Sequence, residues 1–74
     1  MRNHKLRNAR TAAGLTALEL AEKSGVDEMR IYALERGRGR LGRDEAAALA
    51  DALGMARLEL APQWFSRPAE GGAQ

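Results

Sequence analysis

The chain of 74 residues contains no cysteine and a single histidine, His4. Without cysteine there is neither a disulfide bond nor a thiolate metal site, and one histidine is too few for an imidazole-based zinc site. We therefore expect no metal and no cofactor. Aromatic residues are also scarce, with one tryptophan, one tyrosine and one phenylalanine. The apolar side chains are mostly leucine and alanine, and small alanines let helices approach closely.

Long apolar runs are absent as well. No stretch approaches the roughly 18 residues that a membrane span needs, and the basic start of the chain lacks the apolar region of a signal peptide. We therefore expect no membrane partner and a cytoplasmic location, of bacterial or phage type. A chain this short predicts one small domain. We place that domain at residues 1–66, followed by a flexible tail at residues 67–74.

Basic charge is unevenly placed, although the formal net charge is only +2. Ten of the twelve basic residues are arginine, and four of these lie between Arg36 and Arg43. A second basic group comprises Arg2, Lys5, Arg7 and Arg10. Guanidinium groups bind phosphate in bidentate fashion, so the pattern fits a polyanionic partner. It fits a solvated, arginine-rich surface equally well.

Apolar periodicity and capping residues predict five helices and no strand, which is an all-α fold. Thr16 and Glu19 have the spacing of a capping box, and Asp27 is a second N-cap candidate. The expected helices cover residues 5–13, 16–24, 27–37, 43–53 and 56–60, with Pro62 ending the last. The expected core consists of apolar side chains at helical spacing: Leu6, Ala9, Ala13, Leu15, Leu20, Ala21, Val26, Ile31, Leu34, Leu49, Ala50, Leu53, Met55 and Leu58.

Several of these segments together carry a family resemblance. They are Leu6 and Arg10, Gly14-Leu15-Thr16, Leu20-Ala21, Gly25-Val26, Ile31, Leu34-Glu35-Arg36-Gly37 and Leu49-Ala50-Asp51-Ala52-Leu53-Gly54. Over about residues 5–60 the chain resembles the lambda-repressor-like helix-turn-helix domains, of the Cro/CI and xenobiotic-response-element type. The physical chemistry agrees, because a small Ala21 suits a close helix crossing and Gly25 suits the positive φ of the turn.

The resemblance implies a compact five-helix domain with an ion pair between Arg10 and Glu35. It also implies that the second helix starts against a DNA phosphate and that helix 28–36 faces base edges. Arginines in the following loop would then hold the DNA backbone. The DNA-binding residues implied in this way are Thr16, Ala17, Asp27, Glu28, Met29, Arg30, Tyr32, Ala33, Arg36, Arg38, Arg40 and Arg43.

Three positions depart from the family pattern. Glutamine is common where this chain has Ala17 and Glu28. Ala17 offers a phosphate only its amide, and Glu28 can accept from a cytosine N4 but cannot make the bidentate adenine contact of glutamine. Asp27 and Glu28 also fit a purely local role as helix cap and dipole partner. Leu41 replaces a proline common in the loop before the fourth helix, so we expect that loop to be mobile.

The end of the domain carries apolar side chains that the core does not clearly require: Leu58, Leu60, Trp64 and Phe65. They either fold back on the core or form the interface of a homodimer. The family often uses its last helix for the dimer contact, and a two-fold dimer would place two recognition helices roughly 34 Å apart on DNA.

Nothing in the sequence indicates an enzyme, since no catalytic triad, nucleotide-binding loop or cofactor lysine is present. The resemblance implies a sequence-specific transcriptional regulator, a repressor, that binds a palindromic operator in double-stranded DNA as a homodimer. The alternative is a protein-interaction module or antitoxin of the same fold, whose main partner is a protein such as a toxin or another regulator.

Overall fold

The helices begin where side chains supply the hydrogen bonds that a first turn lacks. In the computed structural model, which describes residues 4–65, the backbone N–H of Glu19 donates to Thr16 Oγ1 at 3.0 Å. The backbone N–H of Thr16 donates in return to Glu19 Oε1 at 2.8 Å, which completes the capping box. Asp27 caps the next helix by accepting from the N–H of Met29 at 2.9 Å. Both predicted N-caps are confirmed.

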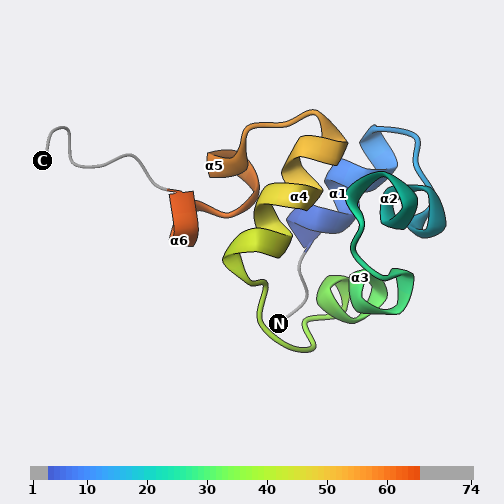
Figure 1. Ribbon diagram of the computed structural model, residues 1–74, viewed down its shortest axis with the longest axis horizontal. Coiled ribbons are helices and arrows are strands. Elements are labelled where there is room, and N and C mark those ends of the chain that lie inside the picture. The colour runs from blue at the N-terminus through green and yellow to red at the C-terminus, as the bar shows by residue number, and fades with distance from the viewer. Residues whose placement is uncertain (1–3, 66–74) are drawn as a thin grey trace, which may run out of the picture.

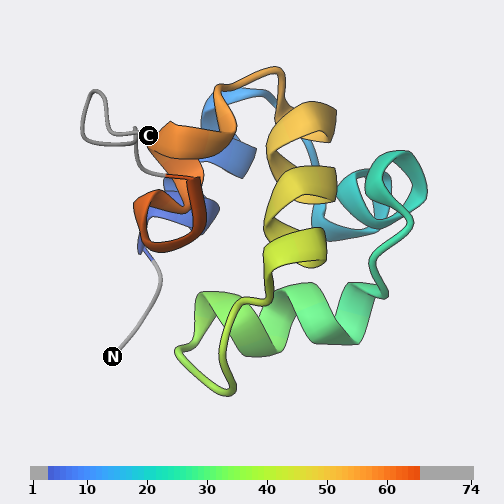
Figure 2. The same cartoon turned by 60° about the vertical axis from the view of Figure 1, so that its left-hand side comes forward.

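Six helices make up the described chain, and residues 4–65 contain no strand. They are α1 (His4–Ala12), α2 (Ala17–Ser24), α3 (Glu28–Glu35), α4 (Arg43–Leu53), α5 (Arg57–Leu60) and α6 (Pro62–Phe65). Figure 1 shows the arrangement, and Figure 2 shows α4 upright at the centre, α3 crossing below it and α2 beside it. The all-α prediction is confirmed.

The turn between α2 and α3 joins the two helices of the motif. Gly25 has a left-handed backbone (φ 80°, ψ 4°), and its N–H donates to the carbonyl of Ala21 at 2.8 Å. A side chain at this φ would be strained, so glycine fixes the sharp turn. α2 packs against both α3 and α4, and α3 also contacts α1, so α3 is held by two other helices.

The core lies between these helices, and most of its predicted members are buried or pack against it. The buried apolar side chains are Leu6, Ala17, Leu20, Ile31, Leu34, Leu41, Ala46, Leu49, Ala50, Leu60 and Ala61. Leu15, Ala21, Val26, Leu53 and Met55 pack against this cluster. The prediction is wrong for Ala13, which is exposed because it follows the end of α1, where the chain turns.

Pro62 starts a helix, although we expected it only to end one. α5 ends at Leu60, and its C-cap residue Ala61 has a φ of −138°, within the range usual for a residue before proline. Pro62 then occupies the first position of α6, where a missing N–H costs no intrahelical hydrogen bond. The fold therefore has a sixth helical turn that brings Trp64 and Phe65 back beside the domain.

The expected domain of residues 1–66 and the expected tail of residues 67–74 reach beyond the described part of the chain, and the whole tail lies outside it. Within residues 4–65, no helix is long and apolar enough to cross a membrane. The same residues contain no group of three side chains suited to holding a metal ion.

Candidate nucleic-acid interface

α3 presents an exposed face opposite the side chains that anchor it. Ile31 and Leu34 are buried, with 0% and 3% of their surfaces exposed. On the other side Met29 is 71% exposed and Tyr32 is 38% exposed. Glu28 and Ala33 are half-buried, and Asp27 is exposed at the start of the helix. The residues expected to meet base edges therefore gather at one end and along one face of α3.

The N-terminus of α2 has two amides that no helical turn can satisfy. The capping box uses the N–H groups of Thr16 and Glu19. The amides of Ala17 and Leu18 have no preceding turn to donate to, so they are available to an anion. The Ala17 side chain is only 2% exposed and belongs to the core. Its expected role in binding is thereby limited to its backbone N–H.

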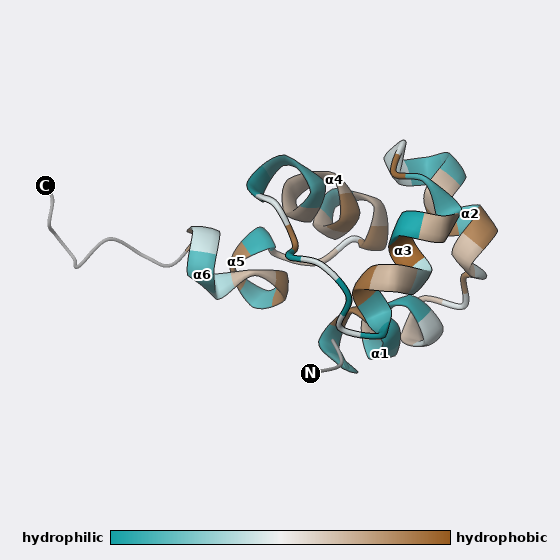
Figure 3. Cartoon of the chain, turned by 90° about the horizontal axis from the view of Figure 1, so that it is seen from below, coloured by the Kyte–Doolittle hydropathy of each residue, from teal (hydrophilic) through white to brown (hydrophobic). Residues whose placement is uncertain are grey.

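The loop between α3 and α4 carries the densest positive charge. Arg36, Arg38, Arg40 and Arg43 are all exposed. None of the four forms an ion pair with a described residue, whereas Arg10, Arg30 and Arg57 each do. Figure 3 shows hydrophilic positions alternating with near-neutral ones along the loop, with a hydrophobic position before it enters α4. Unpaired arginines in a loop that also lacks acidic residues suit phosphate binding.

Arg30, which is expected to contact DNA, forms hydrogen bonds within the chain, and its side chain is 35% exposed. Its Nε and Nη2 donate to the two carboxylate oxygens of Glu45 at 2.7 Å and 2.9 Å. Nη2 also donates to the carbonyl of Arg40 at 2.8 Å. The hydrogen bonds from Arg30 lower the pKa of Glu45, and the bonded carboxylate raises the pKa of Arg30. The structure thus uses Arg30 to hold the loop.

Arg10 and Glu35 form a nearly buried ion pair between α1 and α3. Arg10 Nε donates to Glu35 Oε2 at 2.6 Å and Nη2 donates to Oε1 at 3.1 Å. Nη1 donates to the carbonyl of Leu15 at 3.0 Å. The side chains are 13% and 6% exposed, and the hydrogen bonds to Glu35 raise the pKa of Arg10. The pair fixes how α3 sits on α1.

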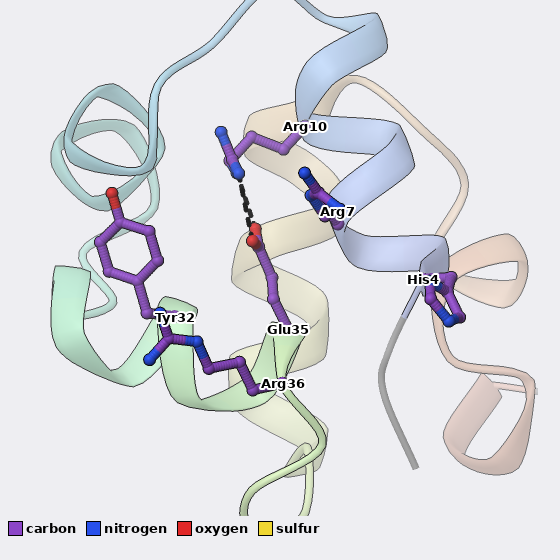
Figure 4. Close-up of a pocket in the computed structure, with 6 residues that line it drawn as sticks. All are labelled: His4, Arg7, Arg10, Tyr32, Glu35 and Arg36. Carbon is purple, nitrogen blue, oxygen red and sulfur yellow. Dashed lines mark hydrogen bonds and ion pairs between the residues drawn. The ribbon is translucent and has the colours of Figure 1, made fainter.

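A polar cavity of about 420 Å³ opens beside this ion pair. It is lined by His4, Arg7, Arg10, Tyr32, Glu35 and Arg36. Figure 4 shows Tyr32 on α3 and Arg36 directly after it, with Arg7 and His4 on α1 across the opening. Arg7 and Arg36 form no ion pair with a described residue, so positive charge extends from the loop to this side of α3.

The C-terminal apolar residues fold back on the domain. Leu60, expected at a dimer interface, is 4% exposed within the single chain and so belongs to the core. Leu58 and Phe65 are half-buried. Trp64 is 44% exposed, and its indole N–H donates to the carbonyl of Leu41 at 2.8 Å. Leu41 itself is 6% exposed, so the loop expected to be mobile is anchored by a buried side chain.

Sequence reasoning missed Glu45, and it named Trp64 as a core or dimer residue without foreseeing its bond to the loop. Glu45 lies in the first turn of α4, where acidic residues are common, and only its pairing with Arg30 reveals its role. The bond from Trp64 to Leu41 spans 23 positions, and no local pattern signals it.

Comparison with known proteins agrees with this geometry. The helix-turn-helix family matches residues 6–60. Among solved structures, the chain is similar to the restriction-modification controller protein C.AhdI from Aeromonas hydrophila, with 36% sequence identity and a TM-score of 0.76. That similarity covers 78% of this chain and 88% of the other. No curated protein matches the chain.

These findings support a DNA-binding transcription regulator and point away from an enzyme. The match spans the capping box, the turn at Gly25, the exposed face of α3 and the arginine loop, residues 36–43 between α3 and the start of α4. On this evidence, the chain belongs to the lambda-repressor-like helix-turn-helix family.

Proposed function

We propose that this chain is a sequence-specific transcriptional repressor that binds a palindromic operator as a homodimer. One observation carries the proposal. Four exposed arginines, Arg36, Arg38, Arg40 and Arg43, have no carboxylate partner among the described residues, and they adjoin the exposed face of α3. Clustered cations without carboxylate partners, beside the exposed face of a helix, suit double-stranded DNA, whose backbone is anionic and whose major groove admits a helix.

In the docking we propose, α3 enters the major groove. Met29 and Tyr32 are its most exposed side chains, and they meet base edges together with Glu28. Met29 offers an apolar surface for a thymine methyl group, and Glu28 can accept a hydrogen bond from cytosine N4. The free amides at the start of α2 bind one phosphate, and the arginine loop binds the backbone on the other side of the groove.

The homodimer follows from the limits of a single recognition helix. One helix reads only a few base pairs, whereas two copies related by a two-fold axis double the contacts and require a palindromic site. Leu58, Trp64 and Phe65 remain partly exposed on α5 and α6 and form the proposed interface, without the buried Leu60. Occupation of an operator represses transcription by excluding other proteins from that DNA. The similarity to a restriction-modification controller protein supports a regulator of that kind.

Selection of bound duplexes from a random pool tests the proposal. Sequencing should reveal an inverted repeat whose half-sites are centred about one helical turn apart, roughly 34 Å. Sedimentation should then show two chains for each selected duplex. Enrichment of a single half-site bound by one chain would contradict the dimer. If no sequence were enriched and no duplex bound at low salt, the DNA-binding proposal would fail. The alternative, a module whose main partner is a protein, would then remain.

A further inference from the structure

The arginine loop is held through two consecutive backbone carbonyls. The carbonyl of Arg40 accepts from Arg30 Nη2 at 2.8 Å, and the carbonyl of Leu41 accepts from Trp64 Nε1 at 2.8 Å. The donors come from α3 and α6, which lie on opposite sides of the loop in the sequence. Three of the six residues between positions 37 and 42 are glycine. This flexible segment is held by one donor that precedes it in the chain and by one that follows it.

Arg30 is itself held firmly. Its guanidinium makes two hydrogen bonds to Glu45, and the same carboxylate accepts from the N–H of Gly42 at 3.1 Å. The loop passes close to this group. A Cβ built at Gly39, whose φ is +78°, would lie 2.7 Å from Arg30 Nη1. Glycine at this position therefore gives both the backbone conformation and the close approach that the Arg30 contact needs.

Trp64 holds the other carbonyl from outside the helix-turn-helix motif. The Leu41 side chain is buried, so the indole bond fixes a residue that is also anchored in the core. The neighbouring ring of Phe65 lies 5.6 Å from the guanidinium carbon of Arg43, a cation–π distance. α6 therefore contacts the loop at Leu41 and the start of α4 at Arg43.

From these contacts we infer that Trp64 is a positioning residue for phosphate binding. By holding the Leu41 carbonyl, it keeps the exposed side chains of Arg38 and Arg40 in the arrangement that meets the DNA backbone. A glycine-rich loop left free would lose conformational entropy on binding, and a loop fixed in advance avoids that loss. This inference rests on the proposed DNA binding, but its structural part concerns the free protein.

Trp64→Phe keeps an aromatic ring at this position and removes the N–H donor. The N–H of Arg38 donates to the Ala33 carbonyl and that of Gly42 donates to Glu45, so these two loop amides report on the loop. In the free variant their hydrogen exchange should accelerate roughly fivefold, the effect of one net hydrogen bond. Exchange in α2 and α4 should stay unchanged. DNA affinity should fall by about the same factor, and sedimentation should give the same oligomeric state as the wild type, because the aromatic ring proposed to lie at the dimer interface is retained. Gln63→Ala, a neighbouring exposed change on α6, is the matched control and should alter neither quantity.

A second variant keeps the test decisive if the smaller phenylalanine ring packs poorly at position 64. The chain has one tryptophan, so replacing tryptophan by β-(3-benzothienyl)alanine exchanges only the N–H of residue 64 for sulfur. The ring shape is retained, and the loop should again exchange faster and bind DNA more weakly. The indole N–H of the wild type gives a single NMR resonance, which should be protected from exchange and should report the bond directly.

The outcomes separate this inference from the proposed function. A uniform rise in exchange across all helices would assign Trp64 to general stability and overturn the positioning role. Faster loop exchange with unchanged DNA affinity would overturn it too. If the wild type bound no duplex at low salt, the proposed function would fail. The loop-exchange result would still decide whether Trp64 holds the loop.

Discussion

Removing the Glu35 carboxylate should strongly destabilise the domain. Glu35→Ala deletes both hydrogen bonds at 2.6 Å and 3.1 Å and leaves Arg10 with only the Leu15 carbonyl. The Arg10 side chain is 13% exposed, so its charge would be largely desolvated and unpaired. The expected loss is about 3 kcal/mol of unfolding free energy. A domain this small has roughly 3–5 kcal/mol in total, so the variant should be close to unfolding.

Thermal unfolding followed by circular dichroism measures this loss. For a domain of this size, about 3 kcal/mol corresponds to a fall in Tm of roughly 12–24 °C. The double variant Arg10→Ala, Glu35→Ala removes both charges. It should therefore be more stable than the sum of the single effects predicts, with a coupling energy of about 2 kcal/mol.

The exposed pair of Arg57 and Asp51 provides the matched control. Its atoms lie 2.7 Å apart, similar to the buried pair, but the side chains are 50% and 55% exposed. A double-mutant cycle there should give no measurable coupling, because solvent screens exposed pairs. Equal Tm shifts for Glu35→Ala and Asp51→Ala would refute the argument from burial. Strict additivity of the Arg10 and Glu35 variants would show that the pair does not interact.

Three further predictions concern the interface, acid stability and the C-terminal helices. Changes at Met29 or Glu28 should alter which sequence is preferred in a selection experiment, whereas Arg38→Ala should weaken binding to all duplexes alike; the reverse pattern would invert the docking. The pKa of Glu45 lies below its ordinary value of 4.5 because it accepts from Arg30, so its stabilising contribution is full above about pH 4.5 and is lost as the pH falls through the lowered pKa. Tm measured between about pH 6 and pH 3 should therefore depend less on pH in Glu45→Gln than in the wild type. Leu60→Ser should unfold the domain, whereas Trp64→Ser should leave circular dichroism native, and unfolding in the second case would place Trp64 in the core.

The helices were largely predictable because their signals are local. A threonine followed by glutamate three positions later specified the start of α2, and aspartate specified the start of α3. The predicted range 43–53 matches α4. The prediction at Pro62 was incomplete, because proline can end one helix and can also occupy the first position of the next. Only the tertiary contacts of the residues after Pro62 decide whether a second helix forms.

The interface was harder to predict, because side-chain partners are set by the tertiary fold. Arg30 has the exposed, basic character of a DNA contact, but Glu45 on α4 lies close enough to bind it. Leu60 has the same apolar character as a dimer contact, and the helical pattern does not say whether the chain itself covers it. The Leu41 substitution suggested a mobile loop, although a buried leucine anchors the loop in place of a rigid proline.

The most direct test of the account is the salt dependence of binding to duplex DNA. If the arginine loop and the start of α2 neutralise about six phosphates, the logarithm of the binding constant should fall against the logarithm of salt concentration with a slope near −5. Arg38→Ala should reduce the slope by about one, and Lys23→Ala, which removes an exposed cation at the far end of α2, should leave it unchanged. A slope near zero, or no binding at low salt, would contradict the assignment of this surface to DNA.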